Sequence, residues 1–116
     1  MADTRVLQLE ILGKDGAALQ RYYGDLFGWS FDTNNPGGYG MTDPATTGVT
    51  VGVASTQDGS SGHVTGYVSV ADLDATLAKV VDLGGSVVMP AFSPAPGVTL
   101  ALVADPEGHV LGLSQA

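Results

Sequence analysis

YVSVADLDATLAKVVDLGGSVVMP, residues 67–90, carries the signals of a strand, a helix and a second strand in immediate succession. Alternation before Asp72 predicts a half-buried strand, and Asp72 is a favourable helix N-cap. Apolar residues then recur at the spacing of one helix face until Gly84 and Gly85 end the helix. The stretch therefore predicts a β-α-β unit, with its second strand at residues 86–89.

The same order of signals occurs earlier in the chain. RVLQLEIL, residues 5–12, alternates as a strand, so Leu9 and Ile11 are expected on one face and Gln8 and Glu10 on the other. Asp15 is then expected to cap a helix that runs to about Phe27.

The two occurrences can be aligned by their landmarks. Asp15 precedes Asp72 by 57 residues, and Asp43-Pro44 precedes Asp105-Pro106 by 62 residues. Further strands are expected at 29–31, 39–42 and 47–54 in the first copy, and at 98–103 and 109–113 in the second, with a loop at 93–97. Such drifting offsets predict two copies of one β-α-β-β-β unit.

The predicted fold class is α+β, with two tandem βαβββ modules that pair into a curved mixed sheet around a cleft. Residues 1–116 are expected to form one domain. Module one covers about 5–54, a flexible polar linker covers 55–62, and module two covers about 63–114.

Composition narrows the classes of partner. Four basic residues stand against 12 acidic ones, and the net charge of -8 argues against nucleic acid and anionic membranes as partners. The sequence has no cysteine, which excludes disulfides and thiolate chemistry, and no stretch typical of a signal peptide or membrane span. We therefore expect a cytoplasmic protein, whose 44% apolar content fits a large core, an apolar cavity or a subunit interface.

Three segments carry a family resemblance. LQRYYGDLFGWSFD (19–32), residues 67–90 and DPEGHVLGL (105–113) resemble the vicinal oxygen chelate (VOC) superfamily, which includes glyoxalases, bleomycin-resistance proteins and extradiol dioxygenases. The resemblance implies the two-module fold and a homodimer. It does not imply one reaction, because the superfamily includes lyases, isomerases, epimerases, dioxygenases, thiol transferases and drug-binding proteins.

The resemblance also indicates where metal-using members place their ligands. Those positions are occupied here by Gln8, Thr65 and Gly112, and Thr50 is the nearest polar candidate for the remaining one. A divalent ion prefers anionic oxygen or imidazole donors, which an amide, a hydroxyl and a glycine do not supply. We therefore expect no cofactor, while a divalent metal held by Gln8, Glu10 and His63 stays the alternative.

The same strands suggest an acid–base site. Glu10 shares a face with Gln8, and His63 shares strand parity with Thr65 and Tyr67, so Glu10 could act with His63 or Tyr67 in proton transfer. The alternatives are that Glu10 is a polar strand-edge residue and that His63 is a solvated strand end. His109, just past the Asp105 turn, is expected to be a turn or surface residue.

Several large side chains could line an apolar pocket in which a flat ligand stacks. At strand spacing they could equally belong to the core or to a dimer interface. These residues are Trp29, Phe31, Tyr39, Met41 and Phe92.

Three function classes follow. The leading hypothesis is a VOC-like protein that binds a small, largely apolar or aromatic organic molecule without the usual metal. Its ligand-binding residues would be the polar Gln8, Thr50 and Thr65 and the large side chains of Tyr39, Met41, Trp29 and Phe92. The second is a lyase, isomerase or dioxygenase, metal-dependent or acid–base, using Glu10, Gln8 and His63. The third is an interaction module with a vestigial cleft, so whether the chain is an enzyme stays open.

Overall fold

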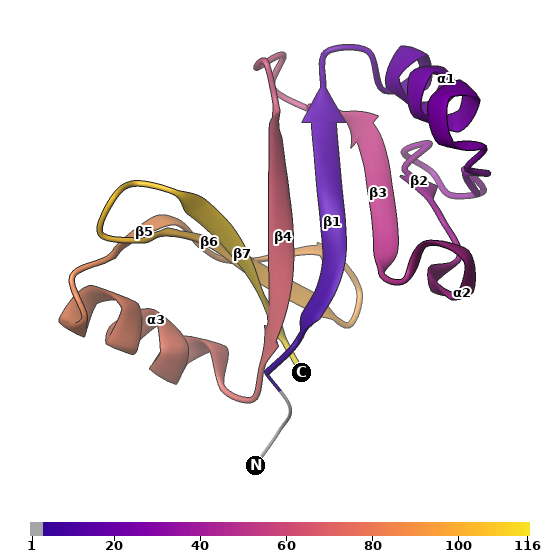
Figure 1. Cartoon of the computed structure of the whole chain (residues 1–116). Helices are drawn as coiled ribbons and strands as arrows, with labels where there is room; N and C mark the ends of the chain where they lie inside the picture. The colour runs from indigo at the N-terminus through magenta and orange to yellow at the C-terminus, as the bar shows by residue number, and fades with distance from the viewer. Residues whose placement is uncertain (1–3) are drawn as a thin grey trace. The chain divides into compact units, whose positions relative to one another are not determined.

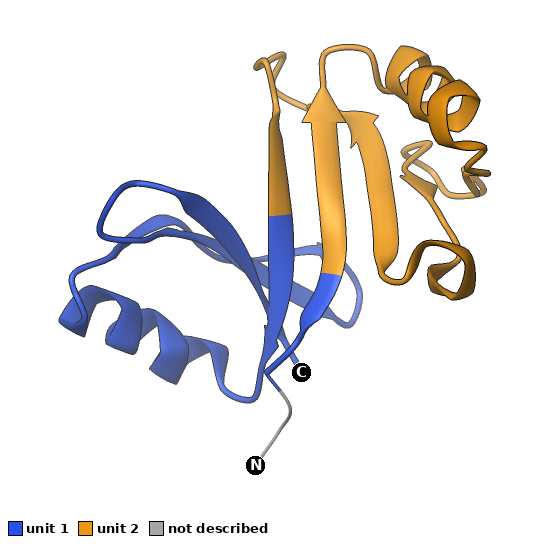
Figure 2. Ribbon diagram, viewed as in Figure 1, with its two compact units in different colours: residues 1–7, 66–116 blue, residues 8–65 orange. Residues whose placement is uncertain are grey.

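The computed structural model describes residues 4–116, which divide into two compact units (Figure 2). Unit 2 comprises residues 8–65, and unit 1 comprises residues 66–116 with the described part of residues 1–7. Within residues 4–116 strands predominate and three helices interrupt them, so the α+β class is confirmed. None of the helices in residues 4–116 combines the length and apolar character needed to cross a membrane.

Unit 2 places one long helix against a short sheet. Its elements are β1 (Val6–Gly13), α1 (Gly16–Phe27), β2 (Gly40–Met41), α2 (Pro44–Thr47), β3 (Thr50–Ser55) and the start of β4 (His63–Val70). Strand β3 pairs in parallel with β1 and antiparallel with β2, and α1 packs against β3 (Figure 1).

The predicted first helix is confirmed at both ends. The Asp15 carboxylate accepts a hydrogen bond from the backbone N–H of Ala18 at 3.0 Å, which satisfies a donor at the start of α1. Gly28, with φ 72°, adopts the left-handed conformation that ends the helix.

Alternation along β1 and β3 separates an apolar face from a polar face. Leu9 and Ile11 face the core of unit 2, whereas Gln8 and Glu10 occupy the opposite face, as predicted. The register pairs Gln8 with Thr50 and Glu10 with Gly52, so β3 extends both faces. The core comprises Ile11, Val51 and Val53, with Leu9, Leu19, Tyr23, Trp29 and Phe31 packed against it.

Unit 1 repeats this plan with a longer sheet. After β4 it contains α3 (Leu73–Asp82), β5 (Ser86–Ala95), β6 (Val98–Ala104) and β7 (Val110–Gln115), and its strands lie in the order β4-β7-β6-β5 (Figure 1). β4 pairs in parallel with β7, as β1 does with β3. The core comprises Val70, Leu73, Ala101, Val103 and Leu113, with Val68, Leu77 and Val80 packed against it.

Some predicted elements differ from the structure. No strand forms over 29–31, because Trp29 and Phe31 pack into the core and only Asp32 forms an isolated bridge, with Met41. Asp43-Pro44 begins the short helix α2, so β3 starts at Thr50 and not at residue 47. The loop expected at 93–97 is shorter, since β5 continues to Ala95 through several register shifts.

Candidate functional site

Four polar side chains of unit 2 form one connected hydrogen-bond network. The Gln8 Nε2 group donates to the Tyr39 hydroxyl at 2.6 Å, and that hydroxyl donates to Glu10 Oε2 at 2.9 Å. The other carboxylate oxygen, Glu10 Oε1, lies 2.9 Å from His63 Nε2. The side chain of Glu10 is 11% exposed and that of His63 is 29% exposed, so the network runs from a buried carboxylate to an accessible imidazole.

Tyr39 reaches this network because β3 has a glycine where the ring crosses it. A Cβ atom on Gly52 would collide with the hydroxyl and ring atoms of Tyr39. Gly52 is the register partner of Glu10, so its missing side chain admits the phenol directly beside the carboxylate. Gly52 was not predicted as a site residue, although an isolated glycine inside an apolar strand is a known sign of close backbone approach.

The loop that carries Tyr39 is held by two amide side chains. Asn35 donates from Nδ2 to the Tyr39 carbonyl at 2.7 Å and accepts from the Tyr39 N–H at 2.9 Å. From α1, Gln20 Nε2 donates to the carbonyls of Gly38 at 3.1 Å and Val53 at 2.8 Å. These contacts hold the backbone of the loop in place and thereby position the Tyr39 hydroxyl. Neither amide side chain was predicted as part of the site.

His63 is positioned by the residue before it. Gly62 has φ 88°, and a Cβ atom there would collide with the backbone of Leu12. Strand β4 therefore starts close against β1, which brings the imidazole to Glu10. His63 and Glu10, which the sequence suggested as an acid–base pair, are in direct contact at 2.9 Å.

Other predicted site residues lie on the same face of unit 2. Thr50 is the register partner of Gln8, and Met41 is the register partner of Gly52, 40% exposed. Thr65 follows His63 with the same strand parity and is buried. Seven predicted site residues therefore lie on the polar face of unit 2: Gln8, Glu10, Tyr39, Met41, Thr50, His63 and Thr65.

The remaining predicted residues belong to the core of unit 2 or to unit 1. Trp29 and Phe31 pack against the core of unit 2, where the indole of Trp29 lies 4.8 Å from the ring of Phe27. Phe92 belongs to β5 of unit 1, opposite Leu100. Tyr67 belongs to the part of β4 in unit 1, where its ring fills the space beside its register partner Gly112.

The donor chemistry does not fit the family's usual divalent ion. Gly112 offers no ligand atom, and a Cβ atom there would collide with the ring of Tyr67. Gln8, Thr50 and Thr65 offer only neutral oxygen donors. In the alternative set, Glu10 and His63 hydrogen-bond to each other, and no cluster of three or more His, Asp or Glu groups suited to a metal occurs in residues 4–116.

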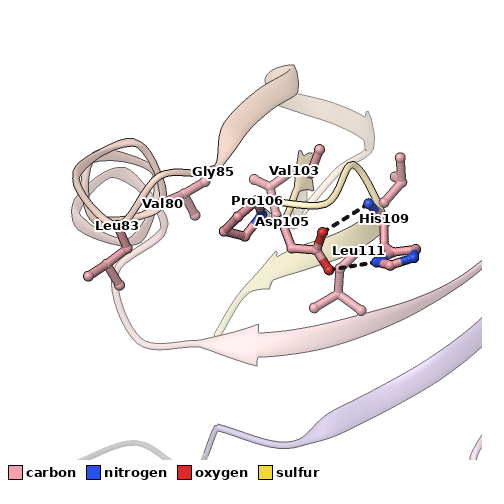
Figure 3. Close-up of a pocket in the computed structure, with 10 residues that line it drawn as sticks. Val80, Leu83, Gly85, Val103, Asp105, Pro106, His109 and Leu111 are labelled. Atoms are coloured by element: carbon pink, nitrogen blue, oxygen red, sulfur yellow. Dashed lines mark hydrogen bonds and ion pairs between the residues drawn. The ribbon is translucent and has the colours of Figure 1, made fainter.

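Two hollows are lined by residues outside this network. One, of about 330 Å³, lies in unit 1 between α3 and the turn after β6 and is lined mainly by apolar side chains such as Val80, Leu83 and Leu111 (Figure 3). The other, of about 520 Å³, lies in unit 2 beside the start of α1.

The Asp105 turn lies at the rim of the first hollow. Asp105 Oδ1 accepts the backbone N–H groups of Glu107 at 2.9 Å and His109 at 3.0 Å, and Oδ2 lies 3.0 Å from His109 Nδ1 (Figure 3). The His109 N–H is the main cause that lowers the pKa of Asp105. His109 is 75% exposed, which agrees with the predicted turn residue.

In both units a strand, a long helix and further strands follow one another, and this repeated plan defines the class of protein. Each unit has a helix on a sheet whose first strand is parallel to its last, which is the arrangement expected of the VOC fold. The chain belongs to the glyoxalase-like domain family, which matches residues 9–114, and through it to the VOC superfamily.

Particular relatives agree with this assignment. The chain is 36% identical over 109 residues to CFP32, provisionally named a glyoxylase, of Mycobacterium tuberculosis (strain CDC 1551 / Oshkosh) and of Mycobacterium bovis. The match covers 88% of this chain but 42% of CFP32, so the chain spans about two-fifths of the length of these relatives.

Solved structures show the same fold at low sequence identity. A glyoxalase/bleomycin resistance protein/dioxygenase superfamily member from Vibrio splendidus 12B01 is 18% identical with a TM-score of 0.66, covering 98% of this chain and 100% of that one. Methylmalonyl-CoA epimerase from Mycobacterium tuberculosis is 15% identical with a TM-score of 0.66, covering 95% and 86%. These likenesses establish the fold and leave the reaction undefined.

Proposed function

We propose that this chain binds a small organic molecule on the polar face of unit 2 and does so without a divalent metal ion. The observation that carries the proposal is the Gln8–Tyr39–Glu10–His63 network, which holds polar groups of two strands and one loop in fixed positions. A few fixed polar groups beside apolar side chains are typical of small-molecule sites.

The polar face supplies both parts of such a site. Met41 and the ring of Tyr39 offer apolar contact area, while Thr50 and Gln8 offer hydrogen-bonding groups next to them. We propose a ligand that is small and largely apolar or aromatic, with polar substituents matched to these groups. Trp29 supports the site from within the core rather than as a stacking surface.

The absence of a metal is proposed from donor chemistry. The space that a ligand side chain at residue 112 would need is taken by the ring of Tyr67. The two strongest potential donors, Glu10 and His63, are bonded to each other. Chelators should therefore leave ligand binding unchanged.

Acid–base catalysis is a second candidate, favoured by one observation. A buried carboxylate in contact with a more exposed imidazole is an arrangement that enzymes use to hold a proton-transfer group. This candidate predicts turnover that is lost in His63→Ala, whereas simple binding predicts ligand uptake with no turnover.

We also propose that the chain forms a homodimer. Helix α1 exposes three large apolar side chains, those of Tyr22, Leu26 and Phe27, each more than half accessible. Sedimentation velocity should detect a dimer that Leu26→Arg weakens. Ala17→Arg, an exposed position on the opposite face of the same helix, is the matched control and should leave the dimer intact; loss of the dimer in both variants, or a monomeric wild type, would contradict the proposal.

The binding proposal is tested by NMR mapping. The ¹⁵N-labelled chain is titrated with aromatic fragments that carry hydroxyl, amide or ether groups, with and without EDTA. We expect amide shifts to concentrate at residues 8–10, 39–41, 50–52 and 63, equally in both conditions. Tyr39→Phe should weaken these shifts, and Tyr22→Phe should not.

Either of two results would count against the binding proposal. Shifts confined to the hollow beside α3 would move the site to unit 1. Shifts that vanish with EDTA would show that a metal is required.

A further inference from the structure

The carboxylate of Glu10 is fully engaged by groups of the protein itself. Oε2 accepts from the Tyr39 hydroxyl and Oε1 contacts His63 Nε2, both at 2.9 Å. The residue is 8% exposed. Glu10 is therefore poorly placed to touch a ligand and well placed to orient the two side chains that it contacts.

The contact with His63 fixes the position of a proton. An ionised carboxylate can only accept hydrogen bonds, so the neutral imidazole must carry its proton on Nε2. The other ring nitrogen, Nδ1, is then left with a lone pair. No group within residues 4–116 hydrogen-bonds to Nδ1, and the His63 side chain is 29% exposed.

Two further acceptors lie on the same face. The amide of Gln8 donates through Nε2 to Tyr39, which leaves its Oε1 atom unused among the described residues. Thr50, the register partner of Gln8, has a hydroxyl with no hydrogen bond to any described group. His63 Nδ1 and Gln8 Oε1 can only accept hydrogen bonds, whereas the Thr50 hydroxyl can donate or accept one.

We infer that His63 Nδ1 is the atom that receives a hydrogen bond from the ligand, and that Glu10 is a positioning residue which fixes the His63 tautomer. The inference rests on the proposed function and names its ligand class: a molecule that presents an O–H or N–H donor. A ligand with only ether or ester oxygens would leave His63 Nδ1 and Gln8 Oε1 unmatched, which costs affinity.

The second histidine supplies an internal reference. At His109 the carboxylate of Asp105 contacts Nδ1 at 3.0 Å, so the proton is expected on Nδ1 and the lone pair on Nε2. The two histidines of the chain should therefore occupy opposite tautomers.

Long-range ¹H–¹⁵N spectra of the full, ligand-free chain test the tautomers directly, above the pH at which imidazoles protonate. We expect the Nε2–H pattern for His63 and the Nδ1–H pattern for His109. Glu10→Gln should abolish the single dominant tautomer at His63, because the amide can donate as well as accept, and Glu10→Asp should retain it in part. Asp105→Asn is the matched control and should change His109 alone.

The ligand class is tested with phenol and its methyl ether, anisole. Phenol at millimolar concentration should shift the His63 Nδ1 resonance, and anisole should not. A His63 that carries its proton on Nδ1, that averages both tautomers in the wild type, or that responds to both probes or to neither would overturn the inference. Fragment shifts at residues 8–10 and 50–52 would in that case still support the proposed function, so the two proposals fail separately.

Discussion

At the residue scale, the hydroxyl of Tyr39 has a double role. It accepts from Gln8 and donates to Glu10, so it links a neutral amide to a buried carboxylate. The ring brings that hydroxyl across β3 from a loop, which makes the geometry of the face depend on one side chain.

Removing this hydroxyl should cost stability. Tyr39→Phe keeps the ring but removes one donor to Glu10 and the acceptor of Gln8, which is worth about 1–3 kcal/mol for groups shielded from water. Urea denaturation followed by circular dichroism measures the free energy of unfolding. Tyr22→Phe, which alters a 59% exposed side chain, is the control and should change it by less than about 0.5 kcal/mol. Equal effects of the two changes would show that the network is not stabilising.

Gly52 should be intolerant of any side chain. In Gly52→Ala the new methyl group overlaps the ring of Tyr39, and such overpacking costs about 1–3 kcal/mol. Gly37→Ala is the control, because its Cβ atom would meet nothing within 4 Å and its φ is not positive. Tyrosine fluorescence and urea denaturation should both change in Gly52→Ala; an unchanged Tyr39 environment there would refute the packing argument.

At the element scale, short-range signals predicted the two long helices, α1 and α3, but not the short helix α2. Asp15 and Asp72 cap α1 and α3, and each carboxylate accepts the expected backbone N–H, because capping depends only on neighbouring residues. The strand predicted over 29–31 was wrong because the packing of Trp29 and Phe31 against the core overrides local strand preference.

Strand parity was equally informative about the site. It placed Gln8 and Glu10 on one face of β1, since side-chain direction alternates along a strand. It also placed His63 on one face with Thr65, and in the structure His63 contacts Glu10. It could not place Tyr39 over Gly52, because that contact joins a loop to a distant strand. It could not place Asn35 against the Tyr39 backbone either, because that contact lies within an irregular loop and leaves no periodic signal. Tyr39 was predicted as a stacking surface, and its hydrogen bonds were not anticipated.

The Asp105 turn should give an acid-dependent contribution to stability. The N–H donors of His109 and Glu107 favour the charged carboxylate and lower its pKa from the ordinary value of 3.8. A pKa lower in the folded state than in the unfolded state means that the turn stabilises the fold above the unfolded pKa. That stabilisation is lost as the pH falls through the folded pKa.

Carboxyl ¹³C titration should therefore place the Asp105 pKa below 3.8. Between about pH 5 and pH 2, Asp105→Asn should lose less stability than the wild type. Asp25→Asn, whose exposed carboxylate accepts no hydrogen bond within residues 4–116, is the control and should behave like the wild type. An Asp105 pKa above 3.8 would contradict the hydrogen-bond geometry.

At the scale of the whole molecule, the two units use glycine in the same way. Gly52 admits the ring of Tyr39 on β3, and Gly112 admits the ring of Tyr67 on β7. Both glycines lie opposite the first strand of their unit, facing Glu10 and Tyr67 respectively. At residue 112 the aromatic ring takes the space that a metal-binding carboxylate would need. The repeated glycine–aromatic pair therefore supports the proposal that this chain binds its ligand without a metal.

Binding without a divalent metal is tested by elemental analysis combined with native mass spectrometry of the tag-free protein. The protein is analysed as purified and after incubation with Mn, Fe, Ni, Cu and Zn salts followed by desalting. We predict substoichiometric metal in both samples, with any retained mass being organic. One equivalent of a divalent metal per chain, lost in Glu10→Gln or His63→Ala, would rule out metal-free binding and make the polar face of unit 2 a metal site.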